Sequence, residues 1–183
     1  MHIWTAVSFE DQLSELRDQC TSISEELGLA NPSLTLPIHT SLAISFAVED
    51  CQSESVITEL TDYFSSLTPF SVHTEQIEQN GSIIWLRIKE SPALTGIHTH
   101  LIDLLQRRYG IQPHPFDLDF QFHATLFFGG EENALNTALS RIKFLPLPET
   151  LTAHHFVIGT SPSGQPGTYS VCREIDISRG GPL

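Results

Sequence analysis

The hydrophobic positions of the chain change their period several times, which predicts helices and strands in alternation. Spacings of three and four predict amphipathic helices over residues 13–27, 56–67, 94–105 and 134–142. Gly28 and Gly110 follow the first and third of these segments, where glycine commonly ends a helix. We therefore expect each helix to pack one apolar face on a sheet.

Apolar residues at every second position, rich in β-branched and aromatic types, predict strands. The segments are 3–9, 37–46, 70–78, 82–89, 121–128, 151–160 and 168–177. Asn80 and Gly81 join the third and fourth segments as a hairpin turn, because both residues tolerate positive φ. The order strand, helix, strand, helix occurs twice, so we expect an α+β fold made of two similar halves.

Two of the predicted strands carry the same polar pattern. Residues 39–42 read His-Thr-Ser-Leu, and residues 123–126 read His-Ala-Thr-Leu. Because residues i and i+2 of a strand point to one side, His39 projects beside Ser41 and His123 beside Thr125. The opposite side of each strand is apolar and is expected to face the core. Its members are Ile38, Leu42, Ile44 and Phe46 in the first strand and Phe122, Ala124, Leu126 and Phe128 in the second.

The repetition distinguishes these two histidines from the rest. None of the other seven histidines is followed two residues later by Ser or Thr, and the two that are lie 123 − 39 = 84 residues apart in a chain of 183. A single copy would fit a histidine that serves the structure of a sheet. Two copies in phase, at equivalent points of a duplicated pattern, favour a functional site shared between the halves.

Charge narrows the class of partner. The formal net charge is −13, with only nine Lys and Arg residues. Affinity for long nucleic acids comes mainly from neutralisation of phosphates by basic residues, so this composition argues against such a partner. A small nucleotide or a short RNA end fits the charge better. We expect the protein to act as a monomer.

The sequence also predicts a location. Its first residues lack a basic and an apolar leader segment, and no apolar run is long enough to cross a bilayer, so we expect no membrane association. Cys20, Cys51 and Cys172 are far apart and lack metal-ligand spacing, which indicates reduced thiols. We therefore expect a cytoplasmic protein.

The remaining clustered histidines do not have the spacing of metal ligands. His98 and His100 point about 160° apart on a helix, whereas helical ligand pairs are spaced by four. The adjacent His154 and His155 face opposite sides of a strand. We expect these four and His114 to be solvated or to cap helices, and we expect no metal.

The paired motifs resemble those of the 2H phosphoesterase superfamily, in its branch of 2′,5′ RNA ligase-like proteins and cyclic phosphodiesterases. Ser41 stands where Thr is more usual, and Phe122 stands where Pro often precedes the second histidine. The resemblance covers nearly the whole chain. It implies one bilobal domain over residues 1–178, with each lobe an antiparallel sheet covered by helices on its outer face, and a groove between the lobes. Residues 179–183 are expected to form a frayed tail.

Two histidines suit the opening of a cyclic phosphate, because one can act as general base and the other as general acid. The hydroxyls of Ser41 and Thr125 can donate to the phosphoryl oxygens, so the chemistry needs no cofactor. The residues leave the two proton roles open. Analogy with the family makes His39 the proton donor and His123 the proton acceptor.

Three further residues are candidates for substrate binding. Trp85 and Arg87 lie on the polar face of a predicted strand, where Trp85 could stack on a base and Arg87 could meet a phosphate. The alternative is a cross-strand aromatic pair and a solvated arginine. Tyr169 matches a tyrosine that the resembling family often carries beside its groove.

Three functions from different classes remain. The first is hydrolysis of 2′,3′-cyclic phosphates or 2′,5′-linked nucleotides and RNA ends. The second is the reverse reaction, an RNA 2′,5′-ligase, which mass action disfavours in water. The third is a nucleotide-binding module without turnover, although binding alone does not need two His and hydroxyl pairs.

Overall fold

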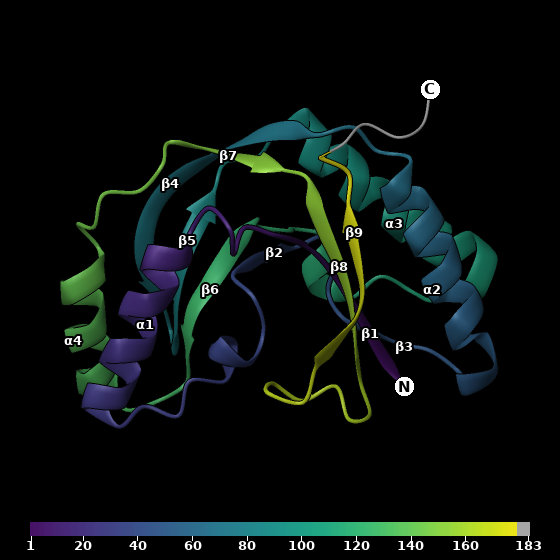
Figure 1. Ribbon diagram of the computed structural model, residues 1–183. Helices are drawn as coiled ribbons and strands as arrows, with labels where there is room; N and C mark the ends of the chain where they lie inside the picture. The colour runs from purple at the N-terminus through teal and green to yellow at the C-terminus, as the bar shows by residue number, and fades with distance from the viewer. Residues whose placement is uncertain (179–183) are drawn as a thin grey trace.

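A computed structural model describes residues 1–178 of the chain, and the expected frayed tail at 179–183 lies outside them. Within the described residues, the strands pair antiparallel in one curled sheet with the order β7-β4-β5-β6-β2-β1-β8-β9, and β3 is added to β1 (Figure 1). The strands are β1 (His2–Ser8), β2 (His39–Ser41), β3 (Phe46–Ala47), β4 (Phe70–Asn80), β5 (Ile83–Ile88), β6 (His123–Phe128), β7 (Thr150–Ala153), β8 (His155–Ser161) and β9 (Ser170–Asp176).

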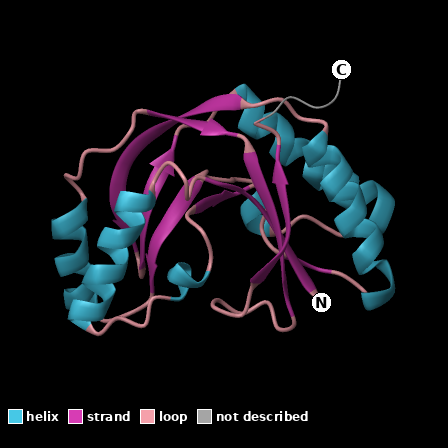
Figure 2. Cartoon of the chain, in the orientation of Figure 1, coloured by secondary structure: helices cyan, strands magenta, loops and turns pink. Residues whose placement is uncertain are grey.

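Two pairs of helices cover the outer side of the curled sheet (Figure 2). One pair, α1 (Ser14–Leu27) and α4 (Glu132–Ile142), packs on the half formed by β4, β5 and β6. The other pair, α2 (Asp50–Ser65) and α3 (Pro92–Tyr109), lies by the half that contains β8 and β9. The sequence joins α1 to β1 and β2, yet the helix packs on the opposite half. α1 therefore connects the two halves of the sheet.

The hydrophobic core lies between the sheet and the helices. Ile84, Leu86 and Ile88 of β5 are at most 3% exposed, which places alternate residues of this strand in the core. A second, smaller apolar cluster lies apart from the main core, on the side of the sheet away from the helices. It consists of Trp4, Ala6 and Val157, with Leu36, Tyr169 and Val171 packed against it.

The expected fold class is confirmed: the chain is α+β, with a curled antiparallel sheet in two halves and helices outside. The predicted hairpin is present, but its turn is shifted by one residue: Asn80 ends β4 and pairs with Ile83, so the turn residues are Gly81 and Ser82, of which Gly81 has a positive φ of 59°. Gly28 and Gly110 end α1 and α3 in the left-handed conformation.

The predicted strand 37–46 is wrong in extent. It consists of the short strands β2 and β3, which are separated because Asp117 Oδ1 accepts the backbone N–H of Ile44 at 2.9 Å. Ile44 is consequently half-buried rather than a core residue. In the second motif strand, the predicted alternation of buried and outward-facing residues holds only as far as Leu126. Phe127 is 1% exposed while Phe128 is half-buried, because the pairing of β5 with β6 shifts register near this end.

The predicted strand 151–160 is two strands at distant places in the sheet. β7 pairs with β4 at one edge, whereas β8 pairs with β1 in the other half. The chain leaves one half and enters the other at His154, which stands between the two strands. The alternation of apolar residues is interrupted at His154 and His155, but periodicity does not indicate that the chain crosses to the other half of the sheet there.

One histidine expected to be solvated or to cap a helix is buried. His98 is 9% exposed, with Nδ1 at 2.8 Å from the carbonyl oxygen of Leu42 and Nε2 at 3.1 Å from that of Asp117. It therefore links the end of the first motif to the segment that precedes the second. His114 does cap a helix, because its ring accepts a backbone N–H at the start of the short 3₁₀ helix Pro115–Asp117.

Candidate active site

The two motif strands pair with each other at the middle of the sheet. Thr40 of β2 lies opposite Ala124 of β6 in the antiparallel ladder. One step outward along each strand, this register sets His39 against Thr125 and Ser41 against His123. The side chains of these four residues share the face opposite to the buried Thr40 and Ala124. A pseudo-twofold relation through the Thr40–Ala124 pair thus exchanges the two motifs.

Each histidine is fixed by the backbone just before it. His39 Nδ1 lies 2.7 Å from the carbonyl oxygen of Pro37, and His123 Nδ1 lies 2.7 Å from that of Gln121. A carbonyl oxygen can only accept, so Nδ1 carries the proton in both rings. The unprotonated nitrogen of each neutral ring is therefore Nε2. No side chain or backbone group among residues 1–178 is bonded to either Nε2.

Burial changes the acidity of both rings. It lowers the pKa of His39 to about 4, against the opposing effect of the bond to Pro37, and His123 and Arg17 add smaller repulsive contributions. Burial also lowers the pKa of His123, again opposed by its backbone bond to Gln121. In the absence of a bound anion, both imidazoles are therefore neutral at pH 7.

A tryptophan packs against each histidine. Trp4 of β1 meets His39 edge-on with ring centroids 4.4 Å apart, and Trp85 of β5 lies 4.3 Å from His123. Gly159 leaves room for the first tryptophan, because a Cβ at this position would lie 2.6 Å from the Trp4 ring. These packed rings restrict the orientation of both imidazoles.

The indole nitrogens of the two tryptophans have different partners. Trp4 Nε1 donates to Ser41 Oγ at 3.0 Å, so it orients the hydroxyl of the first motif. Trp85 Nε1 donates to Glu78 Oε1 at 3.1 Å. Trp4 is not among the site residues predicted from the sequence. In the ladder between β1 and β2, Ala6 lies opposite Ser41. Trp4 is two residues before Ala6 and therefore lies on the same face of the sheet as Ser41. The spacing of two in β1 is the signal that could have found it.

The candidate substrate-binding residues have protein partners. Trp85 is 8% exposed and packs on His123. Arg87 is half-exposed and pairs with Glu75 at 3.2 Å and Glu78 at 3.6 Å. Tyr169 packs against the small apolar cluster, with its ring 6.4 Å from that of Trp4. Their roles toward a substrate stay predictions.

Asn31 supports the second motif strand from a distance in the sequence. Its side chain donates to the carbonyl oxygen of Leu126 at 2.9 Å and accepts the N–H of Phe128 at 3.3 Å. These are the bonds that a neighbouring strand would make. Asn31 therefore completes the edge of β6 where the short strand β2 does not reach.

The fold and the paired histidine motifs define a class of two-lobed phosphoesterases, and the comparisons with known proteins agree. The family model described as the 2'-5' RNA ligase superfamily matches residues 7–162, so the chain belongs to this superfamily. This result confirms the resemblance to 2H phosphoesterases. No curated protein matches the chain.

Solved structures show the same fold at low identity. TT0787 of Thermus thermophilus is 14% identical, with a TM-score of 0.56 and coverage of 96% of this chain and 97% of that chain. E. coli LigT complexed with 3'-AMP is 13% identical, with a TM-score of 0.56 and coverage of 97% and 98%. LigT complexed with ATP is 15% identical, with a TM-score of 0.56 and coverage of 96% of each chain.

Proposed function

We propose that this protein is a metal-independent phosphodiesterase that hydrolyses 2′,3′-cyclic phosphates or 2′,5′-linked nucleotides and RNA ends. The observation that carries the proposal is the arrangement of His39 and His123. Each ring donates through Nδ1 to the backbone and keeps Nε2 for a substrate, beside a hydroxyl residue on the same face. An acid, a base and two donors for the phosphoryl oxygens are thus combined.

In hydrolysis of a cyclic phosphate, a water oxygen attacks phosphorus while one imidazole accepts the proton of the water through Nε2. The bond from phosphorus to a ribose oxygen breaks, and the other imidazole gives its proton to that oxygen. Ser41 and Thr125 donate to the phosphoryl oxygens that gain charge. The proposed roles of His39 as donor and His123 as acceptor follow the resemblance to the family.

The lowered pKa of His39 adds a condition to this mechanism. A donor must be charged, but burial favours the neutral ring. The negative charge of a bound phosphate favours the imidazolium, so His39 acquires its proton as an anionic substrate binds. Substrate binding and protonation of the donor are therefore coupled.

A small substrate suits the rest of the protein. The net charge of −13 disfavours a long polyanion, and Arg87 is shared between two carboxylates. The apolar cluster with Tyr169 offers a surface for a base. LigT, which shares the fold, has been solved with 3'-AMP and with ATP, which supports a nucleotide as the substrate class. Free thiols at Cys20, Cys51 and Cys172 fit a cytoplasmic location.

The test is a screen of 2′,3′-cyclic mononucleotides, 2′,5′-dinucleotides and RNA with a cyclic-phosphate end, in EDTA, with products identified by phosphorus NMR. We expect hydrolysis of at least one class and loss of it in His39→Ala. Activity that needs an added divalent ion would overturn the metal-independent mechanism. Binding without turnover would favour a nucleotide-binding module, and joining of RNA ends would favour a ligase.

A further inference from the structure

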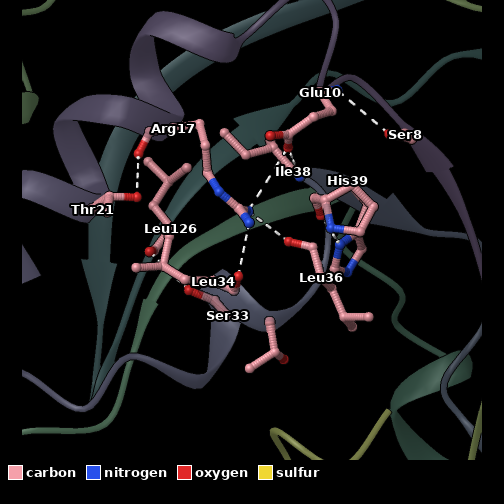
Figure 3. A network of polar contacts seen from close by, with 12 residues as sticks. Ser8, Glu10, Arg17, Thr21, Ser33, Leu34, Leu36, Ile38, His39 and Leu126 are labelled. Carbon is pink, nitrogen blue, oxygen red and sulfur yellow. Dashed lines mark hydrogen bonds and ion pairs between the residues drawn. The ribbon is translucent and has the colours of Figure 1, made fainter. Parts of the chain in front are cut away.

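Arg17 of α1 extends its guanidinium into the segment that precedes the first motif (Figure 3). One terminal nitrogen donates to the carbonyl oxygen of Leu36 at 2.6 Å, and the other donates to that of Leu34 at 2.7 Å. The side chain is 22% exposed. A guanidinium presents its donors in a rigid fork, so two such bonds fix the carbonyls of Leu34 and Leu36 relative to each other.

Glu10 completes the network from the segment between β1 and α1. Its Oε2 accepts the backbone N–H of Ile38 at 2.6 Å and lies 3.8 Å from Arg17 Nη1. The two charged side chains thus hold backbone groups on both sides of Pro37. Pro37 is the residue whose carbonyl accepts the Nδ1 proton of His39.

The segment that ends at Pro37 needs this support because the sheet stops short of it: β2 pairs with β1 only from Ser41 to His39. Within the described chain, the ladder between β2 and β6 consists of the pair Thr40–Ala124. On the other side, the carbonyl of Ile38 accepts the N–H of Phe9 at 2.8 Å. Pro37 has no N–H with which to join a ladder. The Pro37 carbonyl shares its planar peptide group with the Ile38 N–H, so the bond of that N–H to Glu10 sets the direction of the carbonyl.

We propose that Arg17, assisted by Glu10, is a positioning residue for His39. By fixing the Pro37 carbonyl, the network selects the tautomer of His39 with the proton on Nδ1 and directs Nε2 toward the reacting phosphate. The guanidinium donates to backbone carbonyls, so Arg17 acts through His39 and not by contact with the substrate. The effect on turnover rests on the proposed function, whereas the effect on the His39 ring does not.

The charge of Arg17 also acts on the His39 ring directly. The ionisable groups that act on His39 are His123 from β6 and Arg17 from α1, while Glu10 contacts Arg17 and the N–H of the neighbouring Ile38. Ser8 of β1, which pairs with His39 in the ladder, is uncharged. The positive charge of Arg17 disfavours a second proton on the ring, whereas the bond to the Pro37 carbonyl favours it and has the larger effect on the pKa of His39. A variant that loosens both therefore changes this pKa in opposing directions, and the tautomer of His39 is the decisive readout.

The second motif provides an internal control. The carbonyl of Gln121 fixes His123, and the adjacent residue is held by the sheet itself, because Phe122 accepts the N–H of Ile88 at 3.0 Å. The network of Arg17 should therefore affect His39 and leave His123 in place.

The variants separate charge from geometry. Arg17→Met removes both, whereas Arg17→Lys keeps the charge but lacks the fork that reaches two carbonyls. Glu10→Gln keeps an acceptor for Ile38 without the carboxylate charge. Arg141→Met is the matched control, because Arg141 also binds α1, through Glu26, but on the exposed side of the protein.

The first measurement is nitrogen-15 NMR of the histidine rings as a function of pH. The wild type should show His39 with its proton on Nδ1. In Arg17→Met we expect a mixture of tautomers of His39, with His123 unchanged. Arg17→Lys should also give mixed tautomers, because the charge alone does not hold both carbonyls. An unchanged His39 tautomer in folded Arg17→Met or folded Arg17→Lys would overturn the proposal.

The second measurement is steady-state turnover of the best substrate. Loss of alignment should lower kcat of Arg17→Met and Arg17→Lys by about 10–100-fold, with KM changed by less than about threefold. Glu10→Gln should lose less, and Arg141→Met should match the wild type. A rise in KM without loss of kcat would make Arg17 a substrate-binding residue instead. Absence of turnover in the wild type would refute the proposed function alone, because the NMR result stands without it.

Discussion

Trp4 Nε1 donates a hydrogen bond to Ser41 Oγ at 3.0 Å, and the same indole packs against His39. A hydroxyl that accepts one bond from a fixed donor keeps its own hydrogen for another acceptor. Trp4 therefore orients two groups of the first motif at once. In the second motif the indole of Trp85 bonds to Glu78 instead, so the two halves differ in how their hydroxyls are held.

Trp4→Phe should lower turnover modestly. Phenylalanine keeps an aromatic ring against His39 but removes the donor to Ser41. A neutral hydrogen bond contributes about 0.5–1.5 kcal/mol, which corresponds to roughly a 2–10-fold loss in kcat if it is used in the transition state. Steady-state kinetics of the variant give the result, and kcat equal to that of the wild type would show that the bond has no catalytic role.

The motif residues should control turnover and not folding. His39→Ala and His123→Ala remove groups that lie outside the main core, so each should lose about 10²–10⁴-fold in kcat and keep the fold. The double variant should lose less than the product of the two effects, because the rings act as a unit. Thr125→Val should cost about 10²–10³-fold by loss of a donor to the phosphate.

Leu42, which directly follows β2, and Leu126 of β6 provide the controls. Leu42 is fully buried and Leu126 is 2% exposed, so their replacement by Ala should open cavities and cost about 2–5 kcal/mol of stability. Thermal melting beside turnover separates the two kinds of residue. Histidine variants that melt early like the leucine variants, or that stay active, would contradict the enzymatic assignment.

Thr40 lies in the first motif, but its side chain is on the buried face, opposite to His39 and Ser41. Its hydroxyl is buried with no hydrogen-bond partner among residues 1–178, and the residue is fully buried. Thr40→Val replaces this hydroxyl by a methyl group of similar size, so it should raise the free energy of unfolding by about 1–3 kcal/mol. Urea denaturation measures the change. Turnover should stay at the wild-type level, and a destabilised Thr40→Val would indicate a partner for the hydroxyl.

The sequence was sufficient for the parts of the site that depend on local spacing. In each motif, histidine and hydroxyl residue are two apart in one strand, so their shared face follows from strand geometry. Arg17, Glu10 and Asn31 were missed because the backbone groups that they bind are 17 to 97 residues away in the sequence, and no periodicity marks such contacts. The chain crossing at His154 was missed for the same reason.

The rate should depend on pH in a way that reflects the lowered pKa values of both rings. In a two-histidine mechanism the active free enzyme carries one proton on the pair, so kcat/KM should follow a bell-shaped curve. Burial lowers the pKa of His39 to about 4 and also lowers that of His123. The free enzyme therefore loses the last proton shared by the two rings at a pH below the ordinary imidazole pKa of about 6.5.

It follows that kcat/KM should already fall, by up to about tenfold per pH unit, as the pH rises above about 6.5. The curve for kcat should extend to higher pH, because the negative charge of the bound phosphate helps the donor to keep its proton. Rates of hydrolysis of a cyclic mononucleotide from pH 4 to 9 provide both curves. If kcat/KM rises steadily through pH 8, the rings do not share a proton as proposed. If instead both curves fall at the same pH, substrate binding does not supply the charge that the donor needs.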